Sequence, residues 1–164
     1  MHTSRAEPPS RSVDIRILAG LARGRSYARI ALDLHLPHDV VLAHIPQLCR
    51  RMGARSTAHA VALAYGHGWM KGLRREPRQG VVLSARQLTV LACVAKGLTP
   101  EQIAQRLGIQ LSAVTDCMER TCARLRANDR PHAIALAIQH GHVTAPRSFA
   151  DTQPSQSAAQ MTPS

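Results

Sequence analysis

The chain repeats itself at a fixed interval of 73 residues. Shifting the first half by this interval, without a gap, places Leu18-Ala19 on Leu91-Ala92 and Gly24 on Gly97. Shared alanines and leucines alone can arise from helical composition, but a register kept through the glycines and across three turns predicts two copies of one unit. Further identities in this register are Ile30-Ala31 with Ile103-Ala104, Leu34 with Leu107, Val41 with Val114, Cys49 with Cys122, Arg51 with Arg124, His59-Ala60 with His132-Ala133 and His67-Gly68 with His140-Gly141.

The second half carries clear signals for the starts of helices. Ser84 is followed three residues later by Gln87, and Thr99 by Gln102, which is the spacing of a capping box. Pro100 stands at the first helical position, where its missing N–H costs nothing. We therefore predict that helices begin after Ser84 and after Thr99.

Helix ends and an apolar stripe complete the pattern. Gly97 and Gly108 stand where a left-handed residue ends the first and second helices, and Asp129 can cap a fourth helix. At helical spacing, the residues expected to point inward are Ile103, Ala104, Leu107, Ile109, Val114, Met118, Thr121, Leu125, Ile134, Leu136, Ala137 and Ile138. The pattern of residues 83–143 thus predicts four short amphipathic helices, of which the second and third form a helix-turn-helix.

Four sequence blocks in register carry a family resemblance. They are L-S-x-R-Q-x-x-V-L, A-K-G-L-T-P-E-Q-I-A-Q-R-L-G-I, the following x-x-x-A-V, and R-P-H-A-I-A-L-A. A bare helix-turn-helix is weakly specific, but these blocks together resemble the LuxR-type (GerE-like) family over the whole segment, and the fourth helix argues against sigma-factor region 4. The resemblance implies that the third helix enters the major groove of DNA.

The predicted fold is all-α, with two tandem four-helix helix-turn-helix units of LuxR/GerE type. We place a degenerate first unit at residues 12–68 and a second at 84–143, joined by a basic linker at 69–83. Polar residues 1–11 and the Pro/Ser/Gln/Ala-rich residues 144–164 are expected to be disordered. Aromatic residues are only 2% of the chain, so aliphatic side chains must build both cores.

The charge balance favours a polyanion as partner. The chain has 21 Lys plus Arg against 10 Asp plus Glu, a net charge of +11. An alternative without functional meaning is codon bias, because 19 of these 21 cations are arginine. The charge coincides with a helix-turn-helix, however, so we expect double-stranded DNA as the partner.

Other classes of protein are disfavoured by what the sequence lacks. No apolar run is long enough to span a bilayer and residues 1–12 lack a signal-peptide core, so we expect a cytoplasmic protein. The cysteines at 49, 93, 117 and 122 have no C-x-x-C spacing and are expected to be free thiols, and the histidines to serve packing or solvation. No phosphate loop or catalytic triad is present, which predicts a non-enzyme without a cofactor or metal.

The resemblance also implies which residues face the groove. They are Thr115, Asp116 and Glu119 in the second copy and Leu42, Ala43 and Pro46 in the first. The family usually carries Lys, a small polar residue or His, and another basic or polar residue there. Two carboxylates oppose approach to phosphates, although each can accept a hydrogen bond from a cytosine amino group. The first copy offers no hydrogen-bond donor at these positions.

The third helices also depart from the family at their amino ends. The family's capping serine is replaced by Pro37 and Gln110, so we expect Asp39 and Ser112 to cap two residues later and to shorten both helices. Pro46 inside the first copy's helix is expected to remove a backbone hydrogen bond and to kink the helix near Leu42.

The remaining candidates for DNA contact are polar and basic residues of both copies. In the second copy they are Gln110, Ser112 and Thr115 for bases, and Thr99, Arg120, Arg124 and Arg126 for phosphates. In the first copy they are Tyr27, Arg29, Arg50, Arg51 and Arg55 for phosphates, with His44 matching the histidine of the family's third helix, whereas Cys117 does not. The alternative for Arg50, Arg51, Arg124 and Arg126 is the ordinary solvated flank of a helix.

The fourth helix is the usual pairing surface in this family. A tandem chain can make that contact internally, as a pseudo-dimer, or two chains can form a homodimer through it. Two histidine pairs repeat, His59/His132 and His67/His140. They either lie at the pairing surface, where protonation at acid pH would weaken the contact between the helices, or are exposed helix residues. The linker cations Lys71, Arg74, Arg75 and Arg78 belong either to a solvated tether or to an additional phosphate clamp.

Two functions remain open from sequence. One is a DNA-binding transcription regulator in which the second copy engages DNA. The other is a protein-protein interaction module, an adaptor or anti-regulator, in which the Leu42/Ala43 and Asp116/Glu119 faces dock onto another regulator or onto RNA polymerase. The charge favours the first function, and the contents of the third helices favour the second.

Overall fold

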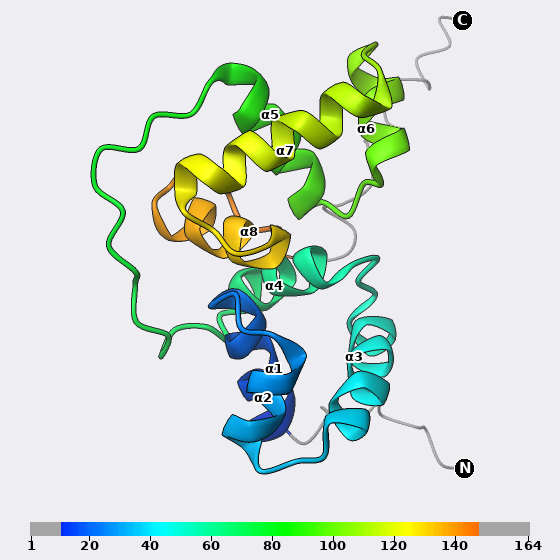
Figure 1. Ribbon diagram of the computed structural model, residues 1–164, viewed down its shortest axis with the longest axis vertical. Helices are drawn as coiled ribbons and strands as arrows, with labels where there is room; N and C mark the ends of the chain where they lie inside the picture. Colours follow the sequence, from blue (N-terminus) through cyan, green and yellow to red (C-terminus); the bar gives the residue numbers. More distant parts are fainter. Residues whose placement is uncertain (1–10, 148–164) are drawn as a thin grey trace, which may run out of the picture.

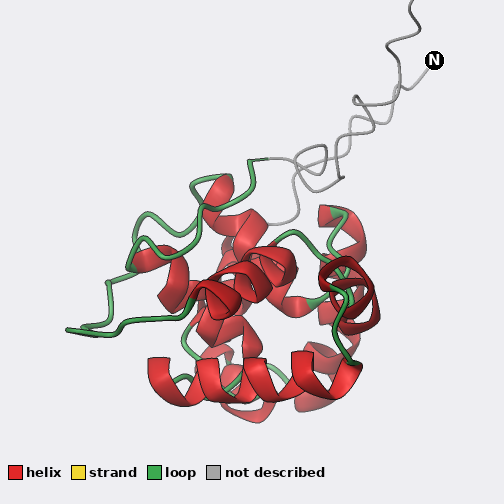
Figure 2. Ribbon diagram, turned by 90° about the horizontal axis from the view of Figure 1, so that it is seen from above, coloured by secondary structure: helices red, strands yellow, loops and turns green. Residues whose placement is uncertain are grey.

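A computed structural model describes residues 11–147, which consist of helices and loops without a strand (Figures 1 and 2). The helices are α1 (Arg11–Ala22), α2 (Tyr27–Leu34), α3 (His38–Met52), α4 (Thr57–Gly66), α5 (Ala85–Ala95), α6 (Pro100–Leu107), α7 (Leu111–Leu125) and α8 (Arg130–Gln139). The predicted all-α fold is confirmed.

The helices form two four-helix units, α1–α4 (the first unit) and α5–α8 (the second unit). The bounds of α2, α3 and α4 recur in α6, α7 and α8 after 73 residues at both ends. Left-handed backbone recurs at the same interval, at Gly24 and Gly97, His35 and Gly108, Gly53 and Arg126, and Gly68 and Gly141. The two units therefore share helix lengths and the turns that connect them.

Three predicted helix starts are confirmed. Ser84 and Thr99 form complete capping boxes with Gln87 and Gln102, and Asp129 accepts a hydrogen bond from the His132 backbone N–H. These caps satisfy N–H groups that have no acceptor within the helix.

The expected shortening of the two third helices is wrong. α3 begins at His38 and α7 at Leu111, directly after Pro37 and Gln110, and neither helix has a side-chain cap. Both preceding residues already have the extended backbone of a helix-capping position, and both are exposed, so water can satisfy the first-turn N–H groups. Asp39 and Ser112 consequently lie inside their helices.

Pro46 does not interrupt α3. The helix runs through it for 15 residues, the same length as α7. Proline cannot donate to the carbonyl of Leu42, but Leu42 and Pro46 are both exposed. Water can therefore replace the missing donor, and the cost of the proline is lower than at a buried position.

The fourth helices of the two units pack against each other more extensively than any other pair of helices. Figure 1 shows α4 and α8 together in the middle of the molecule, with α1–α3 on one side and α5–α7 on the other. Residues 58–64 of α4 and 131–137 of α8 are all buried. A helix that is apolar on every side has to be covered on every side, and each unit supplies part of that cover for the other.

The two cores exchange side chains at this contact. Ala58 and Ala62 of α4 belong to the core of the second unit, and Ala135 of α8 belongs to the core of the first. Gln139 Nε2 also donates a hydrogen bond of 2.7 Å to the Tyr65 hydroxyl oxygen across the contact. Neither hydrophobic core is closed without the other unit.

Two repeated histidines and two repeated glycines form reciprocal contacts between the units. A Cβ placed on Gly97 would lie 2.4 Å from Nδ1 of His59, and one on Gly24 would lie 2.5 Å from Nδ1 of His132. Each glycine therefore permits the close approach of a histidine from the opposite unit. Both histidines are buried at the contact, as one of the two sequence alternatives proposed.

The two buried histidines differ in their partners. Nδ1 of each accepts a backbone N–H, from Arg55 for His59 and from Asn128 for His132. Nε2 of His132 donates to the Glu76 carboxylate at 3.1 Å, whereas Nε2 of His59 has no hydrogen-bond partner among the described residues. Burial, helped by the positive charge of Arg55, lowers the pKa of His59 to about 4, so this ring is neutral at pH 7.

The linker lies along the second unit, and Figure 1 shows it as a long loop on one side of the molecule. Arg78 Nε donates to the Leu125 carbonyl at 2.7 Å, and the Glu76 N–H donates to Gln139 Oε1 at 3.0 Å. Met70 and Leu83 near its two ends are buried. Arg75 and Arg78 thus contact the protein, while Lys71 and Arg74 are exposed.

The predicted disordered ends fall mostly outside the described residues, which omit 1–10 and 148–164. Arg11, assigned to the arm, is the first residue of α1. Pro146, assigned to the tail, is buried, and its carbonyl oxygen would lie 1.7 Å from a Cβ on Gly66. The four cysteines are free thiols, as expected.

Substituting Gly97 by alanine should destabilise the contact between the units. Gly97 and Gly141 both have positive φ, so an alanine is strained at either by about 1 kcal/mol, but only the Gly97 Cβ meets the other unit. We expect Gly97→Ala to lower the free energy of unfolding by about 2–4 kcal/mol and Gly141→Ala by about 1 kcal/mol, measured by urea denaturation. Equal losses in the two variants would contradict the close contact.

Candidate nucleic-acid interface

Helix α7 has a buried face and an exposed face. Val114, Cys117, Met118, Thr121 and Leu125 are buried, as the predicted inward stripe requires, with Cys117 added. The exposed residues include Ser112, Asp116, Glu119, Arg120 and Arg124, with Gln110 exposed just before the helix. Thr115 is half-buried, and its hydroxyl donates to the Leu111 carbonyl at 3.3 Å. The face that the resemblance assigns to DNA is therefore accessible.

An open cleft of about 610 Å³ runs beside this face, between α7 and the start of α5. Arg86, Arg120 and Arg124 line it together with Asp116. Arg86 and Arg120 are exposed and make no hydrogen bond or ion pair with a described residue. Two unpaired guanidinium groups beside an exposed helix are suited to bind phosphate oxygens.

Arg86 was missed among the sequence candidates. It lies in the first turn of α5, two residues after the Ser84 cap, and belongs to the L-S-x-R-Q block. The signal of that block is its capping box, which predicts a helix start and does not indicate which residues of other helices the cation will face. Only the packing of α5 against α7 brings Arg86 to the same cleft as Arg120.

Arg124 and Arg126 also have structural tasks. Arg124 Nη1 donates to the Val82 carbonyl at 2.6 Å, which ties the linker to α7. Arg126 has left-handed backbone and ends α7, and its carbonyl accepts from Arg78 at 3.3 Å. The side chain of Arg126 is exposed beside Arg78 and Arg124 in a smaller pocket.

Thr99 is separated from this group of residues. Its hydroxyl oxygen accepts the Gln102 N–H, and the residue lines a cavity between the two units instead of the cleft beside α7. The structure therefore brings together Arg120 and Arg124 with Arg86, but not with Thr99.

In the first unit, two candidate side chains are bound to a buried carboxylate. Asp14 of α1 is 1% exposed, and both of its oxygens accept from Arg51 Nη2, at 3.1 and 3.0 Å. Nε2 of His44 donates to the same carboxylate. Asp14, His44 and Arg51 thus hold α3 against α1, a structural role that the match of His44 to the family histidine did not suggest.

The other first-unit candidates lie in different surroundings. Arg29 pairs with Asp33 at 3.2 Å, while Tyr27 and Arg55 line the cavity between the units. Arg50 is exposed and makes no hydrogen bond or ion pair with a described residue. Arg50 is thus the candidate on α3 whose charge is available to a phosphate.

The positions of α3 that correspond to Thr115, Asp116 and Glu119 of α7 are apolar. Val40 and Leu42 of α3 are each 43% exposed and Leu32 of α2 is 69% exposed. Ala43 and Pro46 extend the same exposed side of α3. No side-chain hydrogen-bond donor stands at the three positions that correspond to Thr115, Asp116 and Glu119.

Comparison with known proteins identifies the second unit. Residues 81–137 match the family described as bacterial regulatory proteins, luxR family. Residues 81–137 are a LuxR-type helix-turn-helix domain. The match covers α5, α6, α7 and most of α8. Neither the curated proteins nor the solved structures gave a match.

A LuxR-type domain implies DNA-binding transcription regulation, and regulators of this family are not enzymes. Within residues 11–147, no group of three or more His, Cys, Asp or Glu side chains is placed to hold a metal ion. No helix in this range has the length and apolarity needed to cross a membrane.

The neighbouring arginines of α3 should behave differently on removal. Arg51→Ala takes a partner from buried Asp14, and we expect it to lower the free energy of unfolding by about 1–3 kcal/mol. Arg50→Ala removes the same charge from an exposed position, so we expect a change within about 0.5 kcal/mol. Urea denaturation of both variants measures the difference, and similar values for the two would contradict a structural role for Arg51.

Proposed function

We propose that this protein is a transcription regulator whose second unit contacts double-stranded DNA through α7. The observation that carries the proposal is the LuxR-type match over residues 81–137 together with the accessible, cation-flanked face of α7. In helix-turn-helix proteins, the corresponding helix enters the major groove while flanking side chains bind phosphates. The net charge of +11 supports the approach to a polyanion.

Within this proposal, the residues divide by the group of DNA that they contact. Arg86 and Arg120, which have no protein partner among the described residues, bind phosphates. Arg124 and Arg126 add to the positive electrostatic potential that attracts the DNA backbone. Gln110, Ser112 and Thr115, at the amino end of α7, contact bases. Asp116 and Glu119 repel phosphates and accept hydrogen bonds only from bases that present a donor, so affinity should be modest.

The first unit serves as a degenerate copy that supports the second. Its helix bounds, left-handed positions and buried histidine repeat those of the second unit after 73 residues. Its α3 has no donor at the groove-facing positions, and His44 and Arg51 are bound to Asp14. We infer that α4 takes the place of the fourth helix of a partner chain, so that one polypeptide, with units at 12–68 and 84–143, mimics a dimer.

A second function is favoured by the apolar face of the first unit. Leu32, Val40 and Leu42 are exposed on a unit with little capacity for reading DNA. Leu42, Ala43 and Pro46 are exposed at the positions that correspond to the groove-facing ones of α7, and an exposed apolar surface of this kind can bind another protein. In this alternative the chain is an adaptor or anti-regulator that docks onto another regulator or RNA polymerase.

The proposal is tested by measuring the affinity for duplex DNA at several salt concentrations. Two variants of α7 are compared, one that removes a positive charge and one that removes two negative charges. Arg120→Ala should weaken binding and reduce the slope of log affinity against log salt by about 1. Asp116→Asn combined with Glu119→Gln should tighten binding about threefold or more on any sequence, because two repulsions with phosphates are removed. Fluorescence anisotropy of a labelled duplex gives both affinities.

Arg16→Ala is the control, since Arg16 is exposed on α1 of the first unit, where its Nη2 donates to the Asp33 carbonyl at 3.3 Å, and it does not line the cleft beside α7. Its effect on affinity should be much smaller than that of Arg120→Ala. Binding that is absent at low salt, with all variants folded by circular dichroism, would overturn the proposal and leave the interaction module. Unchanged or weaker binding by the carboxylate variant would show that Asp116 and Glu119 do not face phosphates.

A further inference from the structure

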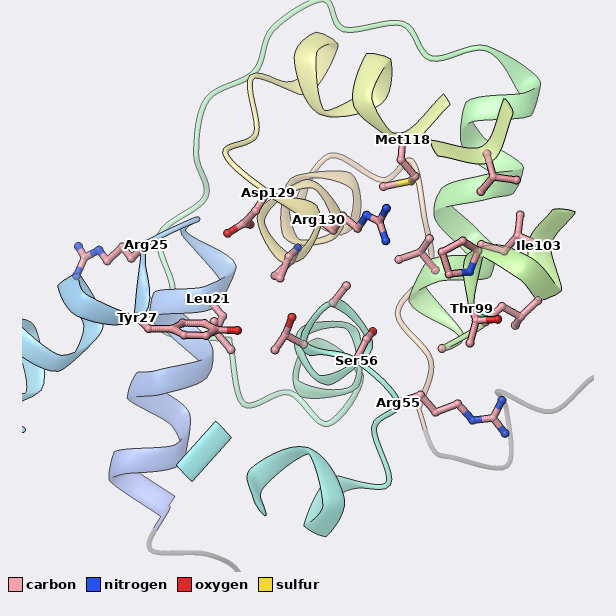
Figure 3. A pocket seen from close by; sticks show the side chains of 18 of the residues that line it. Leu21, Arg25, Tyr27, Arg55, Ser56, Thr99, Ile103, Met118, Asp129 and Arg130 are labelled. Carbon is pink, nitrogen blue, oxygen red and sulfur yellow. The ribbon is translucent and has the colours of Figure 1, made fainter. Parts of the chain in front are cut away.

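A cavity of about 660 Å³ lies between the two units, and Figure 3 shows the side chains around it. The residues at the starts of α2, α4, α6 and α8 all contribute to its wall. Its volume is within the range of about 300–1,000 Å³ that is typical of small-molecule sites. Ser26, Tyr27, Arg55, Ser56, Thr99 and Arg130 of its wall are exposed, so the space is open to solvent and accessible to a ligand.

The wall follows the internal repeat. Leu21 and Val94, Ser26 and Thr99, and Ser56 and Asp129 line the cavity as pairs separated by 73 residues. The two units therefore contribute corresponding segments, and a molecule in the cavity would touch both of them.

The side of the cavity in the second unit is apolar. Ile103, Val114 and Met118 line it, and all three belong to the hydrophobic core of that unit. Figure 3 shows Ile103 and Met118 facing the space from the second unit, with Tyr27 on the opposite side. These three core side chains are at most 3% exposed and lie beneath the surface of the wall, while Leu98 and Pro100 beside them are partly exposed. An apolar chain placed against Leu98 and Pro100 would leave water.

The polar part of the wall is dominated by cations. Arg25, Arg55 and Arg130 line the cavity against one carboxylate, that of Asp129, which is already bound to the His132 N–H. Arg25 pairs with Asp33, whereas Arg130 makes no hydrogen bond or ion pair with a described residue. Figure 3 shows the Arg130 side chain pointing from α8 toward Met118 and Ile103.

Backbone groups add to the positive character near Arg130. Thr57 and Ala58 line the cavity in the first turn of α4, where N–H groups have no acceptor within the helix. The aligned peptide dipoles of α4 also favour an anion at this end of the helix.

We propose that this cavity binds a small amphipathic carboxylate, with its apolar part against the wall formed by Leu98, Pro100 and Met118 and its carboxylate at Arg130. The apolar wall fits the ligand's hydrocarbon chain, and the unpaired guanidinium of Arg130 fits its negative charge. The volume of the cavity fits a ligand of this size. The site uses the buried face of α7, through Val114 and Met118, whereas the proposed DNA contacts use its exposed face. Because the ligand touches both units, its binding stabilises their arrangement and gives the protein a means to sense a metabolite.

Octanoate is the probe for this proposal, titrated into the full chain by isothermal calorimetry with acetate and octanol as comparisons. Octanoate should bind and raise the melting temperature, and the increase should grow with the logarithm of its free concentration above Kd. Acetate, which lacks the chain, should give no binding heat at the same concentration. Octanol, which lacks the charge, should bind the wild type at least about fivefold more weakly than octanoate does.

Alanine variants of two exposed arginines distinguish binding at this site from a general effect of positive charge on octanoate binding. Arg130→Ala should weaken octanoate binding at least about fivefold and leave octanol binding unchanged. Arg106→Ala, which removes an exposed arginine of α6 outside the cavity wall, should leave both unchanged. In carbon-13 methyl spectra, octanoate should shift the Met118 resonance but not that of Met70, which lies in the other core.

Equal octanoate affinity in the wild type and Arg130→Ala would overturn the proposal. So would an acetate response equal to that of octanoate, or the absence of any octanoate binding at millimolar concentration. Circular dichroism and the ligand-free melting temperature confirm that each variant is folded, so that each of these results is decisive.

Discussion

The packing of α4 against α8 is the interaction on which the rest of the structure depends. Both helices are rich in alanine, which lets their backbones approach closely, and both are buried on every side. Ala58 and Ala62 complete the second core, while Ala135 completes the first, so removal of either unit exposes apolar surface on the other. Gly24 and Gly97 extend the contact by admitting the buried histidines of the opposite units.

This shared core has consequences for function. Because the units are fixed through their fourth helices, α3 and α7 are held in one arrangement within a single chain. Helix α7 has exposed polar residues with Arg86 and Arg120 beside it in one cleft. Helix α3 also carries the exposed Arg50, but it presents Leu42, Ala43 and Pro46 at the corresponding positions and is attached to α1 through Asp14. The duplicated framework thus supports two unlike surfaces, one suited to DNA and one suited to a protein, with a cavity between the units.

Much of the fold was predictable because its signals are local. Capping boxes at Ser84 and Thr99 and left-handed glycines are properties of neighbouring residues, and they gave the starts of α5 and α6. The 73-residue register carried the helix pattern to the first unit, while the starts of α3 and α7 were predicted too late. The candidate site was less predictable because its partners are distant in sequence. Asp14 lies 30 residues from His44 and 37 from Arg51 in sequence, and no pattern in the sequence predicts that these side chains are in contact. Arg86 joined the site only through the packing of α5 on α7, and the cavity exists only between folded units.

Differential scanning calorimetry of the whole chain tests most directly whether the two units share one core. If they do, the chain unfolds in a single transition whose calorimetric enthalpy equals its van't Hoff enthalpy, a ratio of about 1. Two separate transitions, or a calorimetric enthalpy about twice the van't Hoff value, would show that the units unfold independently and that the α4–α8 contact does not hold them together.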